Sequence, residues 1–190
     1  MSLESHTQQL TQSLAQASLT PGLLPFLPQD FNPTTQLDVS FNDRPVSFGN
    51  LLRAGECKTA PTVSFSKEND SASSTSYTLL LVDPDAPTPD DPKFAFWRHW
   101  VVSGLKAGQA NGGTALTEYL GPGPKDDSRP HRYLFLLFRE PAGFALAKED
   151  VGGEGFTARR SFQVAEWVER HGLELVGVNW MLGAGDGWKE

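Results

Sequence analysis

The two longest apolar runs of the chain are short, and their length is the strongest constraint on its fold. They are Leu79–Val82 and Leu134–Phe138, and neither approaches the roughly 20 residues of a membrane-spanning helix. Prolines and glycines flank both runs. Short apolar runs between turn signals are typical of β-strands that are covered on both faces. We therefore expect a β-rich domain with two central buried strands and no integral membrane segment.

The composition agrees with many turns and few long helices. The 190 residues include 18 Gly and 14 Pro, whereas hydrophobic residues make up only 38%, a balance that favours turns. A helix is predicted over about 157–171, between a capping Thr157 and Gly172. Alternating or continuous apolar residues predict strands at 37–41, 46–48, 62–65, 77–82, 99–103, 131–138 and 173–181.

The N-terminal segment carries a weakly amphipathic helix over residues 4–19. Leu10 and Leu14 give it a narrow apolar stripe, and Pro21-Gly22 ends it. Helices of this length are marginal alone in water. We therefore divide the chain into an N-terminal helical arm, residues 1–20, and a single domain, residues 21–190. We expect the arm to dock loosely on the domain.

Charge and cysteine content exclude several classes of protein. The net charge of -7 repels nucleic acid and anionic membranes. No Lys or Arg precedes Arg44, so we expect no signal or transit peptide and a cytoplasmic location. Cys57 is the single cysteine, which rules out an internal disulfide. We expect it in an exposed loop, Ala54–Lys58, and not as a catalytic nucleophile.

Polar side chains gather at the ends of three predicted strands. Asp83 and Asp85 follow the 77–82 strand, His99 opens the next strand, and His131 and Tyr133 open the later one. If both later strands pair antiparallel beside the first, these three ends share one edge of the sheet. Residues two apart on a strand also project to the same face. The pattern therefore predicts a pocket at this edge.

The same residues allow two interpretations other than a ligand-binding pocket. Asp-Pro-Asp is ordinary turn chemistry, and a histidine at a strand start is usually a satisfied polar group. Two Asp and two His also suit a metal-dependent hydrolase. The chain lacks a nucleophile elbow, a metalloprotease helix motif and a phosphate-binding loop, so the hydrolase is the alternative to a binding protein and not our first interpretation.

Two motifs resemble the signatures of a known family. The segment 83–87, Asp-Pro-Asp-Ala-Pro, is followed by Asp91-Pro92 and by Trp-Arg-His-Trp at 97–100. The second motif is Gly-Pro-Gly-Pro at 121–124, followed by Pro-His-Arg-Tyr at 130–133. Both resemble the phosphatidylethanolamine-binding proteins, also called the Raf kinase inhibitor protein family. The resemblance is strong from Tyr77 to Phe138, and the N-terminal helix is most similar to the fungal branch, which includes a carboxypeptidase Y inhibitor of yeast.

The resemblance implies a mainly β fold in which a large antiparallel sheet packs on a smaller sheet, with a few peripheral helices. It implies a non-enzymatic protein without a cofactor, whose shallow pocket takes phosphate-like anions or phospholipid head groups, and a cis bond at Ala86-Pro87. A serine carboxypeptidase or a protein kinase is the implied partner, and the N-terminal arm would contact it. By position, the implied ligand-binding residues are Asp83, Asp85, Pro87, Trp97, His99, Gly123, Pro124, His131 and Tyr133.

The sequence departs from the family pattern near the pocket. Ala95-Phe96 replaces an Arg-Glu pair, which predicts a more apolar wall, and Lys125 replaces a proline. Residues 127–129 read Asp-Ser-Arg where the family has Gly-Thr-Gly. Loop shape and charge at the pocket mouth, and with them the preferred ligand, are expected to differ.

Two carboxylates are a poor lining for an anion. Asp83 and Asp85 can accept hydrogen bonds from the backbone and from histidine, one of them can be protonated because like charges raise one pKa, or they can meet a ligand ammonium. In the third case His99, His131, Tyr133 and the Gly123 backbone N–H would hold the phosphate. We favour a mixture of the first and the third arrangement.

Overall fold

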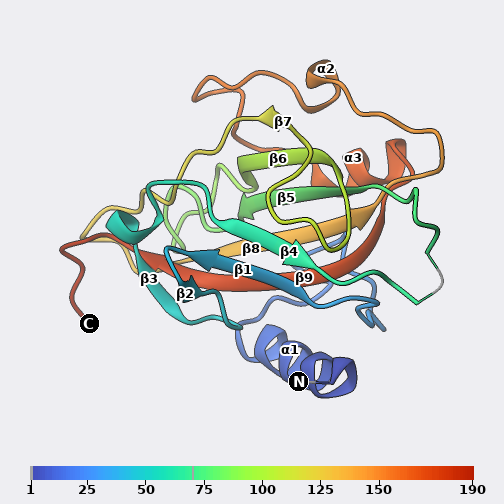
Figure 1. The fold of residues 1–190 in the computed structure, drawn as a ribbon. Helices are drawn as coiled ribbons and strands as arrows, with labels where there is room; N and C mark the ends of the chain where they lie inside the picture. The colour runs from blue at the N-terminus through green and yellow to red at the C-terminus, as the bar shows by residue number, and fades with distance from the viewer. Residues whose placement is uncertain (1, 70) are drawn as a thin grey trace.

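The computed structural model describes residues 2–69 and 71–190, and two β-sheets form its centre (Figure 1). The strand order of the larger, six-stranded sheet is β3-β9-β8-β5-β6-β7. Its neighbouring strands run antiparallel, except that β3 is parallel to β9. The bounds are β3 (Leu51–Arg53), β5 (Tyr77–Asp83), β6 (Trp97–Leu105), β7 (Thr114–Thr117), β8 (His131–Arg139) and β9 (Glu174–Ala184).

The smaller sheet packs on one face of the larger one. Its three strands lie in the order β2 (Arg44–Pro45), β1 (Leu37–Phe41) and β4 (Thr62–Phe65). Val39 and Phe65 of the smaller sheet share one buried cluster with Leu81 and Leu137 of the larger. The predicted architecture, a small sheet on a large and mainly antiparallel one, is confirmed.

The central residues of strands β5 and β8 are all apolar because both faces of these strands are covered. Leu79 and Leu81 of β5 belong to the cluster between the sheets, whereas Leu80 and Val82 belong to a second cluster on the opposite face. All seven residues of β5 are buried. The prediction of two central strands without polar alternation is confirmed.

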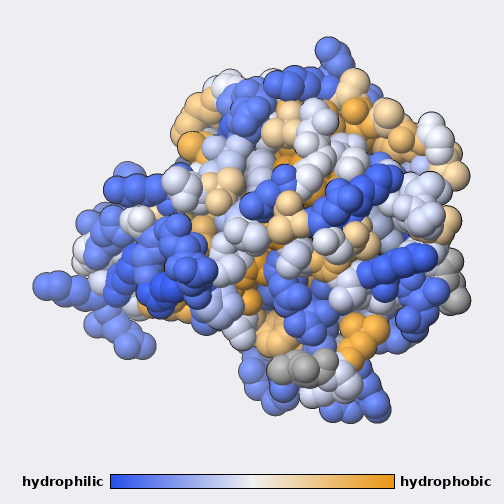
Figure 2. All heavy atoms as spheres, in the orientation of Figure 1, coloured by the Kyte–Doolittle hydropathy of each residue, from blue (hydrophilic) through white to orange (hydrophobic). Residues whose placement is uncertain are grey.

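The helices lie at the periphery and cover the outer face of the larger sheet. They are α1 (Leu3–Gln16), α2 (Lys148–Val151) and α3 (Val164–Arg170), whereas a 3-10 helix at Ala54–Cys57 adds Cys57 to the cluster between the sheets. No helix in residues 2–69 and 71–190 combines the length and apolar character of a bilayer-crossing segment. Most of the face in Figure 2 is hydrophilic, with small scattered apolar patches.

The helix predicted over 157–171 begins only at Val164, and the reason is a buried arginine. Arg159 is 6% exposed, and its guanidinium donates hydrogen bonds to the backbone carbonyls of Arg98, His99 and Glu118. These bonds hold residues 157–161 as turns, and Ser161 has a positive φ of 52°. The sequence pattern gave no sign of this long-range contact.

The strand predicted at 46–48 is also wrong. Asn42 and Asp43 both adopt positive φ, 46° and 66°, which is typical of a two-residue hairpin turn. The chain therefore returns at once, and the short β2 occupies Arg44–Pro45. Strands β3 and β7 were not predicted, because their few residues show no clear alternation.

Cys57 is buried, not exposed as the sequence suggested. Its side chain is 0% exposed at the end of the 3-10 helix. Burial raises the pKa of the thiol to about 12. The group is therefore protonated at neutral pH, which agrees with the expectation that it is no nucleophile.

Helix α1 packs on the domain more closely than its narrow stripe led us to expect. Leu10, Leu14 and Leu19 are 0%, 5% and 1% exposed. The indole Nε1 of Trp180 on β9 donates a hydrogen bond of 3.0 Å to Ser13 Oγ of the helix. Figure 1 shows α1 at the lower edge of the molecule. Residue 1 of the predicted arm lies outside the described residues, and its role as an arm stays a prediction.

Candidate functional site

Antiparallel pairing brings the three predicted strand ends together. Strand β5 lies between β6 and β8, with Asp83 opposite Trp97 and Val82 opposite Leu134. The C-terminal end of β5 therefore lies beside the N-terminal ends of both neighbours. The pairing predicted from the sequence is confirmed, and it places His131 next to Asp83.

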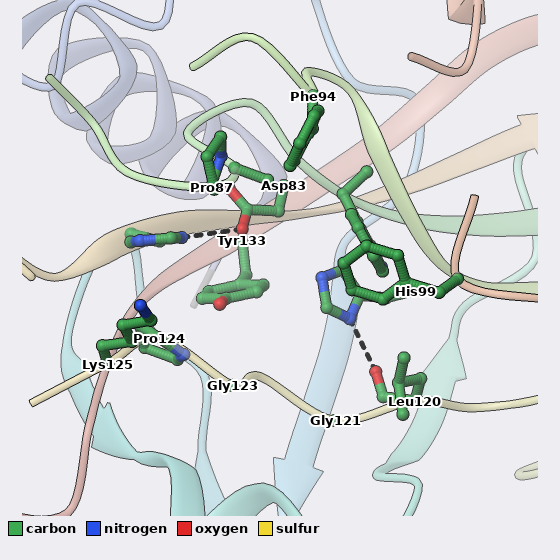
Figure 3. A pocket seen from close by; sticks show the side chains of 14 residues that line it. Asp83, Pro87, Phe94, His99, Leu120, Gly121, Gly123, Pro124, Lys125 and Tyr133 are labelled. Carbon is green, nitrogen blue, oxygen red and sulfur yellow. Dashed lines mark hydrogen bonds and ion pairs between the residues drawn. The ribbon is translucent and has the colours of Figure 1, made fainter. Parts of the chain in front are cut away.

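A cavity of about 350 Å³ opens at this edge (Figure 3). Eight of the nine residues predicted from the sequence line it: Asp83, Pro87, Trp97, His99, Gly123, Pro124, His131 and Tyr133. The other lining residues are Ala86, Phe94, Leu120, Gly121, Lys125 and Phe156. The Ala86-Pro87 peptide is cis, as the family resemblance implies.

The Asp83 carboxylate is held by the protein itself. Its Oδ2 lies 2.8 Å from Nδ1 of His131, and its Oδ1 accepts a 2.6 Å hydrogen bond from the Asp85 backbone N–H. The Nε2 of His131 lies 3.1 Å from Ser128 Oγ. Asp83 and His131 are only 2% and 3% exposed. The negative charge of Asp83 is therefore compensated at the floor of the cavity by neighbouring donors.

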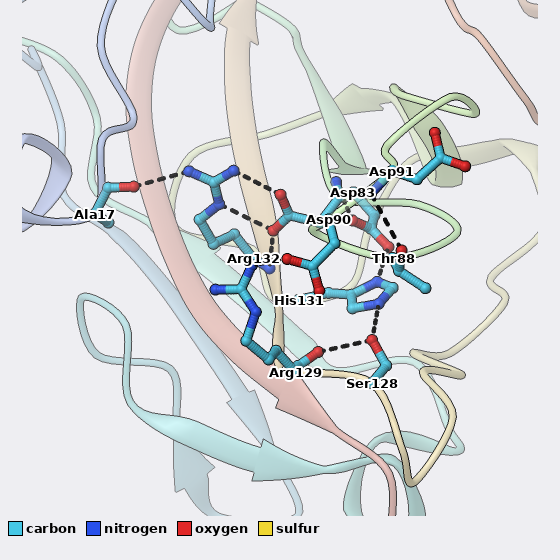
Figure 4. Close-up of polar contacts among 10 residues, drawn as sticks. Ala17, Asp83, Thr88, Asp90, Asp91, Ser128, Arg129, His131 and Arg132 are labelled. Carbon is cyan, nitrogen blue, oxygen red and sulfur yellow. Dashed lines mark hydrogen bonds and ion pairs between the residues drawn. The ribbon is translucent and has the colours of Figure 1, made fainter.

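Asp85 does not line the cavity, unlike the other predicted residues. Its carboxylate accepts three hydrogen bonds from Arg132, one from the backbone N–H at 2.8 Å and two from the guanidinium at 2.9 Å and 2.5 Å (Figure 4). Arg132 also donates to the carbonyl oxygen of Ala17 just after α1, at 2.8 Å. Asp85 thus ties the loop after β5 to β8 and to the N-terminal helix.

His99 presents one free ring nitrogen. Its Nδ1 lies 2.6 Å from the Leu120 carbonyl oxygen, and because a carbonyl can only accept, Nδ1 carries the proton. Burial lowers the pKa of His99, and the nearby Asp83 opposes this effect. The neutral ring therefore has an unprotonated Nε2, for which no hydrogen bond is found within the described residues. This nitrogen can accept a proton or a hydrogen bond from a ligand.

Tyr133 lies between the two histidines and keeps its proton. Its ring stacks on His131 at 6.2 Å and meets His99 edge to face at 5.2 Å between centroids. Burial and, to a lesser extent, Asp83 raise the pKa of the phenol, while a hydrogen bond from the Gly123 backbone opposes the rise. The hydroxyl therefore remains available as a donor for an anionic oxygen.

Lining residues that the sequence did not reveal form an apolar wall. Phe94 and Phe156 come from loops, and Phe156 packs edge to face on Trp97 at 4.7 Å between centroids. Ala95 and Phe96, which the sequence placed in this wall, do not line the cavity. Phe96 instead packs on Phe26, at 5.5 Å. An aromatic residue in a loop has no periodicity, so only the spatial path of the chain shows its role.

Lys125 stands in the cavity wall where the family pattern has a proline. Its side chain is exposed, and Figure 3 shows it beside Pro124 at the edge of the site. The ammonium adds a positive charge near the opening. The departure noted in the sequence therefore changes the electrostatics of the site in favour of anions.

The site offers no ready arrangement for a metal ion. Within residues 2–69 and 71–190, no three His, Cys, Asp or Glu side chains are grouped so that they could bind one. Asp83 and His131 already bind each other, and His99 Nδ1 is held by Leu120. The geometry thus supports hydrogen bonding to a small ligand.

Known proteins resemble the chain in the part that follows helix α1. The family model described as Phosphatidylethanolamine-binding protein matches residues 29–181. The chain belongs to this family. The match begins after helix α1, so the family relationship rests on the domain that carries the two sheets and the cavity.

Two curated proteins are similar to the chain. The rice protein "MOTHER of FT and TFL1 homolog 2" (Oryza sativa subsp. japonica) is 35% identical over 116 residues, which cover 60% of this chain and 63% of the relative. The carboxypeptidase Y inhibitor of Saccharomyces cerevisiae is 29% identical over 184 residues, covering 78% and 84%. The chain thus spans less than two thirds of the rice relative and most of the yeast one.

Solved structures show the same fold. A crystal structure of carboxypeptidase Y inhibitor complexed with its cognate proteinase has a TM-score of 0.79 at 25% identity, covering 95% of this chain and 97% of that one. The phosphatidylethanolamine-binding protein of Plasmodium vivax has a TM-score of 0.71 at 23% identity, covering 92% and 97%. The similarity to the inhibitor extends over nearly the whole chain.

Proposed function

We propose that this member of the phosphatidylethanolamine-binding protein family is a non-enzymatic binding protein whose cavity takes a phosphate-like anion or a phospholipid head group. One observation carries the proposal. Three hydrogen-bonding side chains, His99, His131 and Tyr133, meet in a cavity of about 350 Å³ whose lining is otherwise apolar or glycine, apart from Asp83 and Lys125. Cavities of this kind, with a few convergent polar groups, are typical ligand sites.

The contacts of the two aspartates remove the main objection to an anion. Asp83 is hydrogen-bonded to His131 and to the backbone, and Asp85 is paired with Arg132. Tyr133 then has a free donor and Lys125 a positive charge for the phosphate. The unprotonated Nε2 of His99 is an acceptor suited to the ammonium of a zwitterionic head group. These contacts support the hypothesis that hydrogen bonds within the protein compensate the charges of Asp83 and Asp85. They give less support to the hypothesis that one of the two carboxyl groups is protonated.

The alternative of a metal-dependent hydrolase has little support. It needs Asp83 and His131 as metal ligands, yet they contact each other at 2.8 Å. No third candidate ligand joins them within the described part of the chain. The residues are better suited to hold a ligand than to activate a water molecule through a metal ion.

A peptidase is the better-supported protein partner. The yeast relative is named a carboxypeptidase Y inhibitor, and a solved structure of such an inhibitor with its proteinase matches 95% of this chain. We propose that this chain likewise inhibits a serine carboxypeptidase, with α1 and the residues before it contributing to the contact. Kinase regulation rests on family membership alone.

Calorimetric titration tests the proposed ligand. The wild-type protein should bind phosphate and O-phosphoethanolamine at one site. Tyr133→Phe should weaken both roughly tenfold, the value of one hydrogen bond to a charged group. Tyr119→Phe is the matched control, because its hydroxyl donates to the Cys57 carbonyl and lies outside the cavity lining. Equal binding by both variants would contradict the proposed site.

Inhibition of a purified serine carboxypeptidase tests the proposed partner. Wild-type protein should inhibit the enzyme at equimolar concentrations. The inhibition should not require added phosphate or O-phosphoethanolamine. Absence of inhibition at a large excess would reject this part of the proposal and leave the anion site intact.

A further inference from the structure

His6 occupies a core position in the contact between helix α1 and the domain. It stands on the same face of the helix as Leu10 and Leu14, four and eight residues before them. The residue is only 2% exposed. Its ring packs on Phe48, in the segment between β2 and β3, at 5.1 Å between centroids. A titratable ring therefore stands where the pattern of the helix calls for an apolar side chain.

The Nε2 atom of His6 is buried without a hydrogen-bond partner. Neither a donor nor an acceptor reaches it within residues 2–69 and 71–190. The neutral ring tolerates this position, because its proton can stay on Nδ1 and Nε2 then carries only an unused lone pair. The imidazolium carries a proton on both nitrogens. The charged form would therefore bury both a charge and an unpaired N–H donor, and each is costly.

Few charged groups surround this ring. The segment 46–50, which carries Phe48, contains no charged residue. On the helix itself, Glu4 is exposed and lies two positions away, so it points to another side. On β1, Asp38 is exposed and accepts a hydrogen bond of 2.7 Å from Gln36 Nε2. Burial lowers the pKa of His6, and Asp38 opposes this effect without cancelling it.

The first half of α1 is held on the domain less firmly than the second half. Ser13 accepts a hydrogen bond from Trp180, and the carbonyl of Ala17 accepts one from Arg132. Among the described residues, no such bond joins residues 3–9 to the domain. A cavity of about 330 Å³ also lies beside this contact, lined from both the helix and β9. Apolar packing and the neutral state of His6 therefore keep residues 3–9 in place.

We infer that His6 is a pH-sensitive switch for the docking of α1: residues 3–9 pack on the domain while the ring is neutral and lift from it when the ring takes up a proton. The inference concerns the contact of the helix with its own domain, so it depends neither on the anion site nor on a peptidase partner. Lifting would uncover the ring of Phe48 and free the N-terminal half of α1 for another contact.

The sign of the pH dependence follows from linkage. In the lifted helix His6 is solvated and titrates near its ordinary pKa of about 6.5, whereas burial lowers the pKa of the docked ring. The lifted state therefore binds the proton first as the pH falls. Docking is complete above about pH 6.5 and weakens below it, by up to about tenfold per pH unit, until the pKa of the docked ring is reached.

Hydrogen exchange of the full-length protein, followed by mass spectrometry, tests the inference. Protection of residues 3–9, corrected for the intrinsic effect of pH on exchange, is compared at about pH 7.5 and about pH 5.5. It should fall about tenfold, and more than the protection of the central strand β5, which reports on global unfolding. The imidazole nitrogen signals of His6 should show proton uptake over the same pH range.

Two neutral variants and one matched histidine variant assign the effect. His6→Phe keeps an aromatic contact with Phe48, and His6→Leu continues the apolar stripe. In both, protection of residues 3–9 should change by less than about twofold over this range, because neither side chain titrates. His171→Phe is the control, since its Nε2 is also buried without a partner in the described structure, but at the end of α3. It should keep the tenfold fall.

Three results would overturn the switch. One is protection of residues 3–9 that stays constant between about pH 7.5 and about pH 5.5 in the wild-type protein. Another is an equal fall in His6→Phe or in His6→Leu, because the titrating group would then lie elsewhere. The third is an equal fall in β5, which would show that acid destabilises the whole domain and not the docking of the helix.

Discussion

The buried Asp85 and the partly buried Arg132 form an ion pair outside the cavity lining, with three hydrogen bonds between them. Arg132 lies between His131 and Tyr133 on β8, and these two neighbours face the opposite way, into the cavity. Strand β8 therefore presents ligand-binding side chains on one face and Arg132, paired with Asp85, on the other. Arg132 also donates a hydrogen bond to the carbonyl oxygen of Ala17, just after α1.

Replacement of Asp85 should therefore affect stability more than binding. Asp85→Ala leaves the half-buried Arg132 guanidinium and a backbone N–H without their acceptor, which costs about 1–3 kcal/mol. Chemical denaturation should show this loss, while calorimetry should find phosphate affinity within about threefold of wild type, since a threefold change is less than one hydrogen bond to a charged group. Lost binding at unchanged stability would instead place Asp85 against the ligand.

A second Asp–Arg pair in the same region serves as the control. Asp90 and Arg129 form an ion pair with side chains that are 73% and 66% exposed, as Figure 4 illustrates. Exposed pairs contribute about 0–1 kcal/mol. Asp90→Ala should therefore leave both stability and phosphate affinity nearly unchanged.

Gly183 should be essential for the position of Tyr133. A Cβ built at this residue of β9 would collide with the Tyr133 ring, so Gly183→Ala should displace the phenol and weaken phosphate binding. Overpacking of this kind costs about 1–3 kcal/mol. Gly22→Ala is the control, because its Cβ would meet only Thr20 Oγ1, at 3.9 Å. Wild-type affinity in Gly183→Ala would show that the ring position does not matter for binding.

Anion affinity should rise as the pH falls. Burial lowers the pKa of His99 in the free protein, and a bound anion favours the charged imidazole, so the pKa is higher in the complex. The complex then binds more protons than the free protein between these two pKa values, and affinity increases on acidification by up to about tenfold per pH unit. Sulfate is the probe, since its charge does not change over this range.

The His99→Gln variant isolates this effect. It removes the titrating ring, and sulfate affinity should then lose most of its pH dependence. The wild-type free energy of unfolding should also fall below about pH 6.5, because the unfolded state takes up the proton before the folded one. A sulfate affinity that is independent of pH in the wild type would contradict the assignment of His99 to the ligand site.

Helix α1 should contribute to stability by one face only. Leu10 is 0% exposed and Leu3 is 38% exposed on the same helix. Leu10→Ala should cost about 2–5 kcal/mol, whereas Leu3→Ala should change stability by less than about 0.5 kcal/mol. If the exposed face contacts a carboxypeptidase, Leu3→Ala should weaken inhibition without affecting the fold. Equal stability of the two variants would show that the helix is not docked in solution.

The position of the site at three strand ends could be predicted, because the sequence signals that mark these strands are local. The apolar runs mark β5 and β8, and short connections favour antiparallel neighbours. Asp83, His99 and His131 then follow as neighbours at one edge. Asp85 could not be placed in the same way, because a turn after β5 directs it away from the cavity and towards Arg132.

The contribution of the loop residues Phe94 and Phe156 to the cavity wall could not be predicted from the sequence. Phe156 reaches the cavity from a loop that is held by the buried side chain of Arg159, which bonds to the backbone of β6. Neither residue shows a periodic pattern. The same contact explains why α3 begins at Val164 and not at Thr157, so one long-range interaction accounts for both differences.

Imidazole resonances of the histidines test the anion site most directly. Only four histidines are present, and two of them, His99 and His131, line the cavity. Titration of the wild-type protein with O-phosphoethanolamine, followed by side-chain nitrogen–proton correlation spectra, should shift the signals of His99 and His131 along one saturable curve. His6 and His171, which do not line the cavity, should not move. Saturable shifts of His6 or His171 alone, or no shift at any histidine at saturating ligand, would contradict the site.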